Sequence, residues 1–193
     1  RTLPAVKALK ENYPSSYIAW VVEEPSKALL ESQPEIDQVI LFPRKRWANG
    51  IKSPRRIWGT IAEGWEFILG LRKERFDVVF DFHGILKSGL ISILSGSPKR
   101  IGFDRRSSKE GNFLFSNVKV RLSEDRMSRF KTNFELLKGI GLEVESFTPK
   151  LHVPEKDREY VKSFFDTLSP SLKRPFIAIH PGTSPQTFYK RWM

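Results

Sequence analysis

Short apolar segments alternate with longer stretches in which apolar residues recur at helical spacing, and this alternation constrains the fold most strongly. Segment 17–22 is mainly apolar with little polar interruption, which is typical of a strand buried on both faces of a parallel sheet. Further strands are predicted at 36–41, 76–82, 100–103 and 176–179. Because strands alternate with helices, the sequence predicts an α/β, doubly wound fold with a parallel sheet flanked by helices.

The predicted helices lie between these strands. The one at 57–75 is predicted to present a single apolar face made of Ile57, Trp58, Ile61, Trp65, Ile68 and Leu69. Another is predicted from about Ser123, as its N-cap, to Gly139. The apolar stripe of that helix is predicted to be Met127, Phe130, Phe134 and Leu137. The other predicted helices cover 2–13, 26–31, 84–94 and 154–168, and residues 42–54 are predicted to form a loop.

A polar break at 169–174 separates the last predicted helix from the strand at 176–179, and it marks the predicted domain boundary. Residues 1–153 are predicted to form an N-terminal domain, 154–174 a connecting helix and linker, and 175–193 the first strand and loop of a second domain. The chain opens without a start methionine or a signal-peptide pattern. We expect it to be truncated at both ends.

The net charge of +11 indicates an anionic partner, either nucleic acid, an acidic membrane surface or a phosphorylated substrate. Basic residues gather at 44–46, 52, 55–56, 99–100 and 105–106, although such runs are often only solvated surface. No cysteine is present, which excludes disulfides, thiolate metal sites and cysteine nucleophiles. No apolar run approaches the roughly 20 residues that a membrane-spanning helix needs.

Ligands of open parallel sheets bind beyond the carboxyl ends of the strands, so polar residues there are candidates for a site. The first candidate is the pair Glu23 and Glu24, which could supply a general base or a carboxylate that binds a hydroxyl. Adjacent residues at a strand end face opposite sides, so at most one of the two points into the crevice. The alternative is a solvated turn before the helix at 26–31.

The second candidate is the strand end Asp81-Phe82-His83-Gly84. Gly84 allows a sharp turn into the next helix, whose amino end could receive an anion, and Lys87 would add a positive charge one turn further on. In the alternative interpretation, Asp81 is buried and hydrogen-bonded to the backbone while His83 caps the turn. The sequence leaves both interpretations open.

The third candidate is the segment 180–192, where a strand runs into a glycine turn followed by two hydroxyls and a lysine. Backbone amides, hydroxyls and a lysine at a strand end suit a diphosphate. The segment has no P-loop spacing, and no Gly-x-Gly-x-x-Gly occurs in the chain. Because His83, His152 and His180 lack the close spacing of zinc ligands, no metal is predicted.

Several stretches, in order along the chain, together resemble the ADP-heptose:lipopolysaccharide heptosyltransferases, glycosyltransferase family 9. They are Thr2-Leu3-Pro4-Ala5, Trp20-Val21-Val22-Glu23-Glu24, Phe76-Asp77 with Gly84-Ile85-Leu86-Lys87-Ser88, Arg100-Ile101-Gly102-Phe103-Asp104, and His180-Pro181-Gly182-Thr183-Ser184 with Lys190-Arg191-Trp192. The resemblance implies the GT-B architecture, with a Rossmann-like N-terminal domain whose first strand precedes Arg1. The ADP-binding segment of the second domain would follow Met193, so this chain alone is expected to be inactive.

The resemblance also implies an activity. The enzyme would transfer heptose from ADP-heptose to Kdo or the first heptose of the lipopolysaccharide inner core, with inversion and without a metal or cofactor. Its partners would be the nucleotide-sugar donor, an anionic lipopolysaccharide precursor and the membrane surface, with no nucleic acid. The protein would be cytoplasmic and peripheral on the inner face of the inner membrane.

Residue roles follow from the same resemblance. Lys190 resembles the lysine that contacts the donor diphosphate and stabilises the leaving group, and the general-base aspartate is expected upstream of Arg1. Donor binding is further implied for His180, Gly182, Thr183, Ser184 and Arg191. Acceptor binding is implied for Lys87 and Ser88 and, in the basic loop 44–56, for Arg44, Arg46 and Arg55. Glu24, His83 and Gly84 are added as acceptor-binding candidates because of their position at strand ends.

Two alternatives stay open. An enzyme of the same architecture could use another nucleotide sugar, because a fold does not determine the sugar. The chain could instead be a basic nucleic-acid-binding α/β domain, for which charge is the sole support, since no recognition-helix, zinc-finger or RNP-type signature is present.

Overall fold

The computed structural model describes residues 1–124, 127–144 and 151–168 of the chain. The chain comprises two compact units, Arg1–His152 and Val153–Met193. The described part of the second unit contains α7 (Glu155–Leu168), which agrees with the helix predicted at 154–168. The strand predicted at 176–179 lies outside the described residues.

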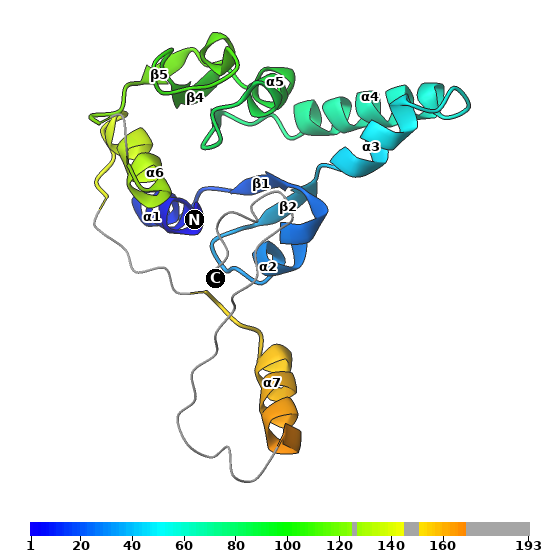
Figure 1. Cartoon of the computed structure of the whole chain (residues 1–193). Helices are drawn as coiled ribbons and strands as arrows, with labels where there is room; N and C mark the ends of the chain where they lie inside the picture. Colours follow the sequence, from blue (N-terminus) through cyan, green and yellow to red (C-terminus); the bar gives the residue numbers. More distant parts are fainter. Residues whose placement is uncertain (125–126, 145–150, 169–193) are drawn as a thin grey trace, which may run out of the picture. The chain divides into compact units, whose positions relative to one another are not determined.

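The first unit alternates strands with helices, as the sequence predicts (Figure 1). Its helices are α1 (Leu3–Asn12), α2 (Lys27–Glu31), α3 (Arg44–Ile51), α4 (Ile57–Lys73), α5 (Leu86–Leu94) and α6 (Arg129–Lys138). Its strands are β1 (Ala19–Val22), β2 (Gln38–Leu41), β3 (Val78–Phe80), β4 (Lys99–Phe103) and β5 (Val118–Val120). Two 3-10 helices, η1 (Glu24–Ser26) and η2 (Asn112–Leu114), follow β1 and precede β5.

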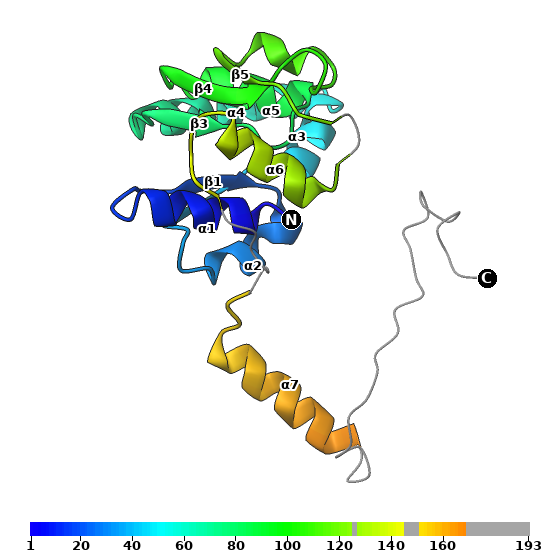
Figure 2. The ribbon, with the colours of Figure 1, turned by 90° about the vertical axis from the view of Figure 1, so that its left-hand side faces the viewer.

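Among the described residues, all paired strands run parallel, and they form two small sheets. In one sheet β1 pairs with β2, with Val22 opposite Leu41. In the other, β4 lies between β3 and β5. Figure 2 shows the β1-containing and β3-containing layers one above the other. A cavity of about 1030 Å³ is lined by every residue of β1 and of β3, one strand from each sheet. The parallel α/β architecture therefore agrees with the prediction, with a cavity between the two sheets.

The core lies where α6 contacts both α1 and the larger sheet. Three residues of α1, namely Ala5, Ala8 and Leu9, form one buried cluster with Leu137 of α6. The second cluster joins Leu136 of α6 to Ile101, Phe103 and Val120 of β4 and β5. Adjacent leucines of α6 thus contribute to both clusters, and they tie α1 to the β3-β4-β5 sheet.

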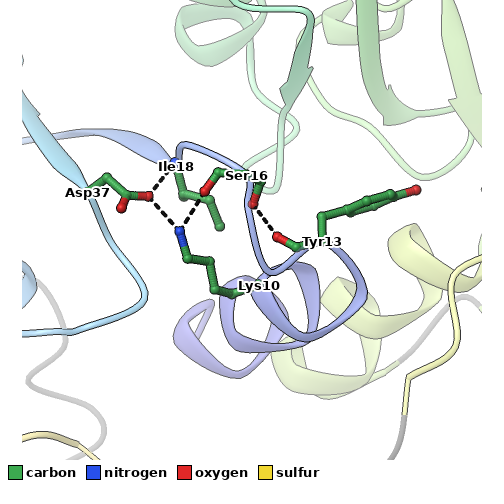
Figure 3. A network of polar contacts seen from close by, with 5 residues as sticks. All are labelled: Lys10, Tyr13, Ser16, Ile18 and Asp37. Atoms are coloured by element: carbon green, nitrogen blue, oxygen red, sulfur yellow. Dashed lines mark hydrogen bonds and ion pairs between the residues drawn. The ribbon is translucent and has the colours of Figure 1, made fainter.

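A polar network anchors the end of α1 to the segments that precede β1 and β2 (Figure 3). The Lys10 ammonium donates a hydrogen bond to Asp37 Oδ2 at 2.9 Å and another to the backbone carbonyl of Ser16. The backbone N–H of Ile18 also donates to Asp37 Oδ2, at 2.7 Å. That hydrogen bond, followed by the one from Lys10, lowers the pKa of Asp37 below its ordinary value. The network fixes where both strands begin.

Three local predictions differ from the structure. Residues 44–51 of the predicted loop are helical and form α3. The helix α6 begins at Arg129 with Ser128 as its N-cap, whose hydroxyl accepts a hydrogen bond from the Lys131 backbone N–H, so the prediction of a cap at Ser123 was wrong. Strand β5 was not predicted, because its three residues offer only one apolar-polar-apolar alternation.

The apolar face predicted for α4 is largely turned to solvent. Four of its predicted members, Trp58, Ile61, Trp65 and Leu69, are exposed. The inward face instead carries Leu71, which is buried, and Phe67, which is half-buried. The Phe67 ring meets those of Phe42 and Trp47 edge-on, at centroid distances of 5.7 and 5.5 Å. Apolar residues lie around most of the circumference of α4, so periodicity alone could not identify the buried side.

Candidate functional site

The site is built where β1, β2 and β3 end. Glu23 directly follows β1, Phe42 follows β2 and Asp81 follows β3. An ion pair between Glu23 and Lys87 of α5 joins the end of the smaller sheet to the helix that follows the first strand of the larger one. Polar groups from both sheets therefore meet at one end of the cavity, which Glu23, His83 and Lys87 help to line.

Glu23, Arg44 and Lys87 form an ion-pair network, called the Glu23 cluster below. The Lys87 ammonium donates a hydrogen bond to Glu23 Oε1, and the Arg44 guanidinium lies 3.6 Å from Oε2 of the same carboxylate. The Lys87 ammonium is also 5.6 Å from the centre of the Phe42 ring, within the range of a cation–π contact. Two cations face one carboxylate, so the cluster carries a net positive charge.

The electrostatics of the Glu23 cluster keep its carboxylate ionised. The hydrogen bond from Lys87 lowers the pKa of Glu23 below its ordinary value, and the charges of Lys87 and Arg44 act in the same direction against the opposing effect of burial. The carboxylate can accept a hydrogen bond from a sugar hydroxyl, while the two cations can pair with an anionic group. The cluster therefore suits a ligand that carries both hydroxyls and negative charge.

The buried Asp81 shapes the turn between β3 and α5. Its Oδ1 accepts hydrogen bonds from the backbone N–H groups of His83 and Gly84, at 2.9 and 3.1 Å. Its Oδ2 accepts from the Ser88 hydroxyl at 2.8 Å and from the Asn112 amide at 2.7 Å. All four donors belong to the protein, so the structure agrees with the interpretation in which Asp81 is buried and bonded to the backbone.

Gly84 meets two steric demands of this turn. It adopts φ +68°, a conformation that side chains other than glycine rarely tolerate. An added Cβ would also lie 3.0 Å from the Phe103 ring. The turn leaves His83 exposed at the cavity. The Ser88 hydroxyl, in contrast, is engaged with Asp81.

Of the remaining predicted acceptor residues, one belongs to the Glu23 cluster and the others lie outside it. Glu24 opens the exposed η1 and is absent from the cavity lining, whereas its neighbour Glu23 lines the cavity. Arg46 pairs at 2.9 Å with Glu63 of α4, outside the Glu23 cluster. Arg55 is exposed in the turn between α3 and α4. Of the three predicted arginines, the structure brings Arg44 to the cluster.

The predicted donor residues lie outside the part of the chain that the structure describes. They are His180, Gly182, Thr183, Ser184, Lys190 and Arg191. Within residues 1–124, 127–144 and 151–168, no three His, Asp or Glu side chains gather as a metal site would require.

Sequence reasoning missed two members of the site. Glu23 was passed over in favour of Glu24, although the spacing rule for strand ends had restricted the choice to one of them. Asn112, which holds Asp81 Oδ2, lies 31 residues further along the chain. No local pattern marks it, because an asparagine after a glycine is an ordinary turn signal.

A comparison with protein families adds the decisive observation. The chain matches the model of glycosyltransferase family 9 (heptosyltransferase) over residues 65–193, which is more than half of its length. The chain belongs to glycosyltransferase family 9. The resemblance predicted from sequence motifs is therefore confirmed.

Curated members of the family are similar to parts of this chain. The lipopolysaccharide heptosyltransferase 1 of Pseudomonas aeruginosa is 31% identical over 111 residues, which cover 56% of this chain and 30% of the relative. The lipopolysaccharide heptosyltransferase 1 of Campylobacter coli is 26% identical over 172 residues, covering 86% of this chain and 46% of the relative. The chain thus spans less than half the length of these family 9 relatives.

Solved structures of family 9 proteins share the fold. The E. coli heptosyltransferase WaaC, solved with ADP-2-deoxy-2-fluoro heptose, aligns with a TM-score of 0.65 and 24% identity over 76% of this chain and 46% of WaaC. The family 9 glycosyl transferase of Veillonella parvula aligns with a TM-score of 0.66 and 18% identity over 86% of this chain and 45% of that protein. The predicted fold, a Rossmann-like GT-B N-terminal domain, is therefore confirmed.

Proposed function

We propose that the full-length protein transfers heptose from ADP-heptose to the inner core of lipopolysaccharide, on Kdo or on the first heptose. Membership of family 9 supports glycosyl transfer, and the names of the curated relatives support the sugar and the acceptor. The Glu23 cluster supports an anionic, hydroxyl-bearing ligand at the carboxyl ends of the strands, where parallel sheets bind their ligands.

In this proposal the Glu23 cluster belongs to the acceptor side. Lys87 and Arg44 would exchange part of their pairing with Glu23 for contacts to the acidic groups of the acceptor. Glu23 would then be free to accept a hydrogen bond from a sugar hydroxyl. His83, which follows β3 at the same end of the cavity, would also contact the acceptor. The cations are already positioned, so little ordering is needed when the acceptor binds.

The proposed reaction inverts the anomeric carbon and needs no metal. An aspartate expected upstream of Arg1 removes the proton of the acceptor hydroxyl, whose oxygen attacks the anomeric carbon from the face opposite the diphosphate. The bond from that carbon to the diphosphate breaks, and ADP leaves with the electron pair. Lys190, with the hydroxyls and amides of Gly182, Thr183 and Ser184, would stabilise the charge that grows on ADP.

The role of Lys190 can be tested by replacing it with alanine in the full-length enzyme. If its ammonium stabilises the leaving group, kcat should fall by about 10²–10³. The exposed Lys162 of α7 provides a matched control, and Lys162→Ala should keep its turnover. A Lys190→Ala enzyme with unchanged kcat would exclude this role.

We further propose that the protein acts at the cytoplasmic face of the inner membrane as a peripheral protein, because the proposed acceptor is a membrane lipid. The net charge of +11 supports an association with an anionic surface. No helix in the described part of the chain is long and apolar enough to cross a bilayer.

The function is tested with the full-length protein, ADP-heptose and a Kdo-lipid acceptor that lacks heptose. Mass spectrometry of the acceptor over time should show the gain of one heptose, in the presence and in the absence of EDTA. A panel of other nucleotide sugars, together with a heptosylated acceptor, tests the choice of donor and position. Transfer of a different sugar would leave the family standing and overturn heptose as the substrate.

A further inference from the structure

Helix α4 presents a row of large apolar residues to solvent. We call Trp58, Ile61, Trp65 and Leu69 the tryptophan stripe. They follow one another at helical spacing, and 79%, 53%, 58% and 49% of their surfaces are exposed. Exposing two tryptophan side chains on one helical face to water is unfavourable in free energy. The stripe therefore indicates a contact surface.

The opposite face of α4 already supplies the contacts that hold the helix in place. Leu71 is buried, and Phe67 packs against the rings of Phe42 and Trp47. The Trp47 indole N–H donates a hydrogen bond to Glu63 Oε2 at 3.0 Å, and this links α3 to α4 (Figure 1). The tryptophan stripe is thus free of the contacts that position α4.

The neighbouring helix α5 also exposes apolar residues. It contacts α4 and carries three exposed apolar residues, also at helical spacing, which are Leu86, Leu90 and Ile93. Apolar surface on two adjoining helices exceeds the scattered single residues that soluble proteins usually expose.

The chain around the tryptophan stripe is strongly basic. Residues 44–66 contain six basic and two acidic side chains. One of these acids, Glu63, is paired with Arg46. Lys52, Arg55 and Arg56 directly precede α4, and no carboxylate of the described residues pairs with them. The apolar stripe therefore begins beside an uncompensated positive charge.

We propose that the tryptophan stripe and the cations at 52, 55 and 56 dock on the surface of a bilayer that contains anionic lipids. Indole rings favour the boundary between headgroups and acyl chains, because their apolar body is buried while the N–H stays hydrated. Lys and Arg beside them are attracted by anionic headgroups. The inference rests on the proposed function in one respect, since a lipid acceptor requires the enzyme to reach a membrane.

Charge favours a membrane over a second copy of the chain. A symmetric dimer through the tryptophan stripe would bring the same patch from each subunit together, and with it Lys52, Arg55 and Arg56 of both. The like charges would repel across the contact. An anionic lipid surface accepts the indoles and neutralises these cations at the same time.

The test measures co-sedimentation of the full-length protein with vesicles of phosphatidylethanolamine and phosphatidylglycerol, and with neutral phosphatidylcholine vesicles. The wild type should bind the anionic vesicles, with a blue shift of tryptophan emission. Trp58→Ser combined with Trp65→Ser should weaken this binding by about tenfold or more, and Lys52→Glu with Arg56→Glu should do the same. Leu114→Ser, at another exposed apolar residue, is the matched control and should bind like the wild type.

Each other outcome overturns the proposal. Failure of the wild type to bind anionic vesicles would exclude the membrane. Equal binding by the substituted proteins would exclude this surface, and circular dichroism would confirm that they are folded. A dimer that the tryptophan substitutions convert to a monomer, without vesicle binding, would assign the stripe to a second copy of the chain.

An activity measurement separates this proposal from the proposed function. The protein with Trp58→Ser and Trp65→Ser should transfer heptose normally to a deacylated, water-soluble acceptor and slowly to the same acceptor in vesicles. If no protein transfers heptose to either acceptor, the proposed function fails, and the vesicle-binding result still decides the docking surface.

Discussion

Asp81 shows how single residues position the site without contacting a ligand. Its two carboxylate oxygens accept four hydrogen bonds, and these bonds define the turn on which His83 lies. The sequence indicated that this strand end was special but could not decide between a ligand-binding and a structural aspartate. The structural role of Asp81 became clear only from its hydrogen bonds to Ser88 and Asn112, which the tertiary structure brings next to it.

Asp81→Asn should destabilise the protein by about 2 kcal/mol. Each carboxylate oxygen of Asp81 accepts two hydrogen bonds, and the asparagine NH2 group would replace one of these oxygens with a donor that faces two other donors. Urea denaturation monitored by circular dichroism measures the change. Asp77→Asn serves as a control at an exposed aspartate, and its effect should stay within about 0.5 kcal/mol. Equal midpoints for the two variants would contradict the structural role of Asp81.

The Glu23 cluster marks the limit of sequence-based prediction at the residue scale. Glu23 and Lys87 are 64 positions apart, and their pairing exists only because α5 follows a strand of the second sheet. Lys87 was recognised through a family motif, whereas Glu24 was chosen as the site carboxylate in place of Glu23, with which Lys87 pairs. Because side chains alternate along a strand, at most one of Glu23 and Glu24 could point into the site. The structure was needed to show which of the two does so.

The elements were predicted more reliably than their faces. Four of the five strands and most helices of the first unit have sequence signals, because alternation of buried strands with amphipathic helices is local information. The inward face of α4 could not be predicted, because apolar residues on both sides satisfy the same periodicity. One side packs against Phe42 and Trp47, and the other is the exposed tryptophan stripe.

The contact between α1 and the start of β2 predicts a pH dependence of stability. The pKa of Asp37 is lowered in the folded protein, so the folded state binds fewer protons there than the unfolded state. The stabilisation is complete above the ordinary value of 3.8 and is lost as pH falls through that value towards the folded pKa. Wild type and Asp37→Asn should therefore differ in unfolding free energy at neutral pH and converge in acid. Parallel curves down to the acid range would contradict this linkage.

At the scale of the whole molecule, the two sheets leave β1 and β3 lining one cavity. We expect a further parallel strand of the full-length protein to fill this space and join the sheets into one, as the Rossmann-like fold implies. Hydrogen exchange should then be slower at the backbone amides of β1 and β3 in the full-length protein than in residues 1–193 alone. Equal exchange in the two proteins would show that the cavity stays open.

The family, the parallel α/β fold and the acceptor-side position of Lys87 were all predicted from the sequence, and the first two are confirmed. Motif residues carried that information because a strand end followed by glycine and lysine is a local pattern. The ion pairs of the Glu23 cluster could not be predicted from such a local pattern. It depends on Arg44 of α3 and Lys87 of α5 meeting at one carboxylate.

The central claim is that the Glu23 cluster binds the acceptor. The most direct test measures KM for both substrates in full-length Lys87→Ala, with Lys99→Ala as a control at an exposed lysine of β4. Loss of one charged contact should raise KM for the Kdo-lipid acceptor by about tenfold, or ~1.4 kcal/mol, and leave KM for ADP-heptose unchanged. A rise in KM for ADP-heptose alone, or no change in either value, would contradict the assignment of this site to the acceptor.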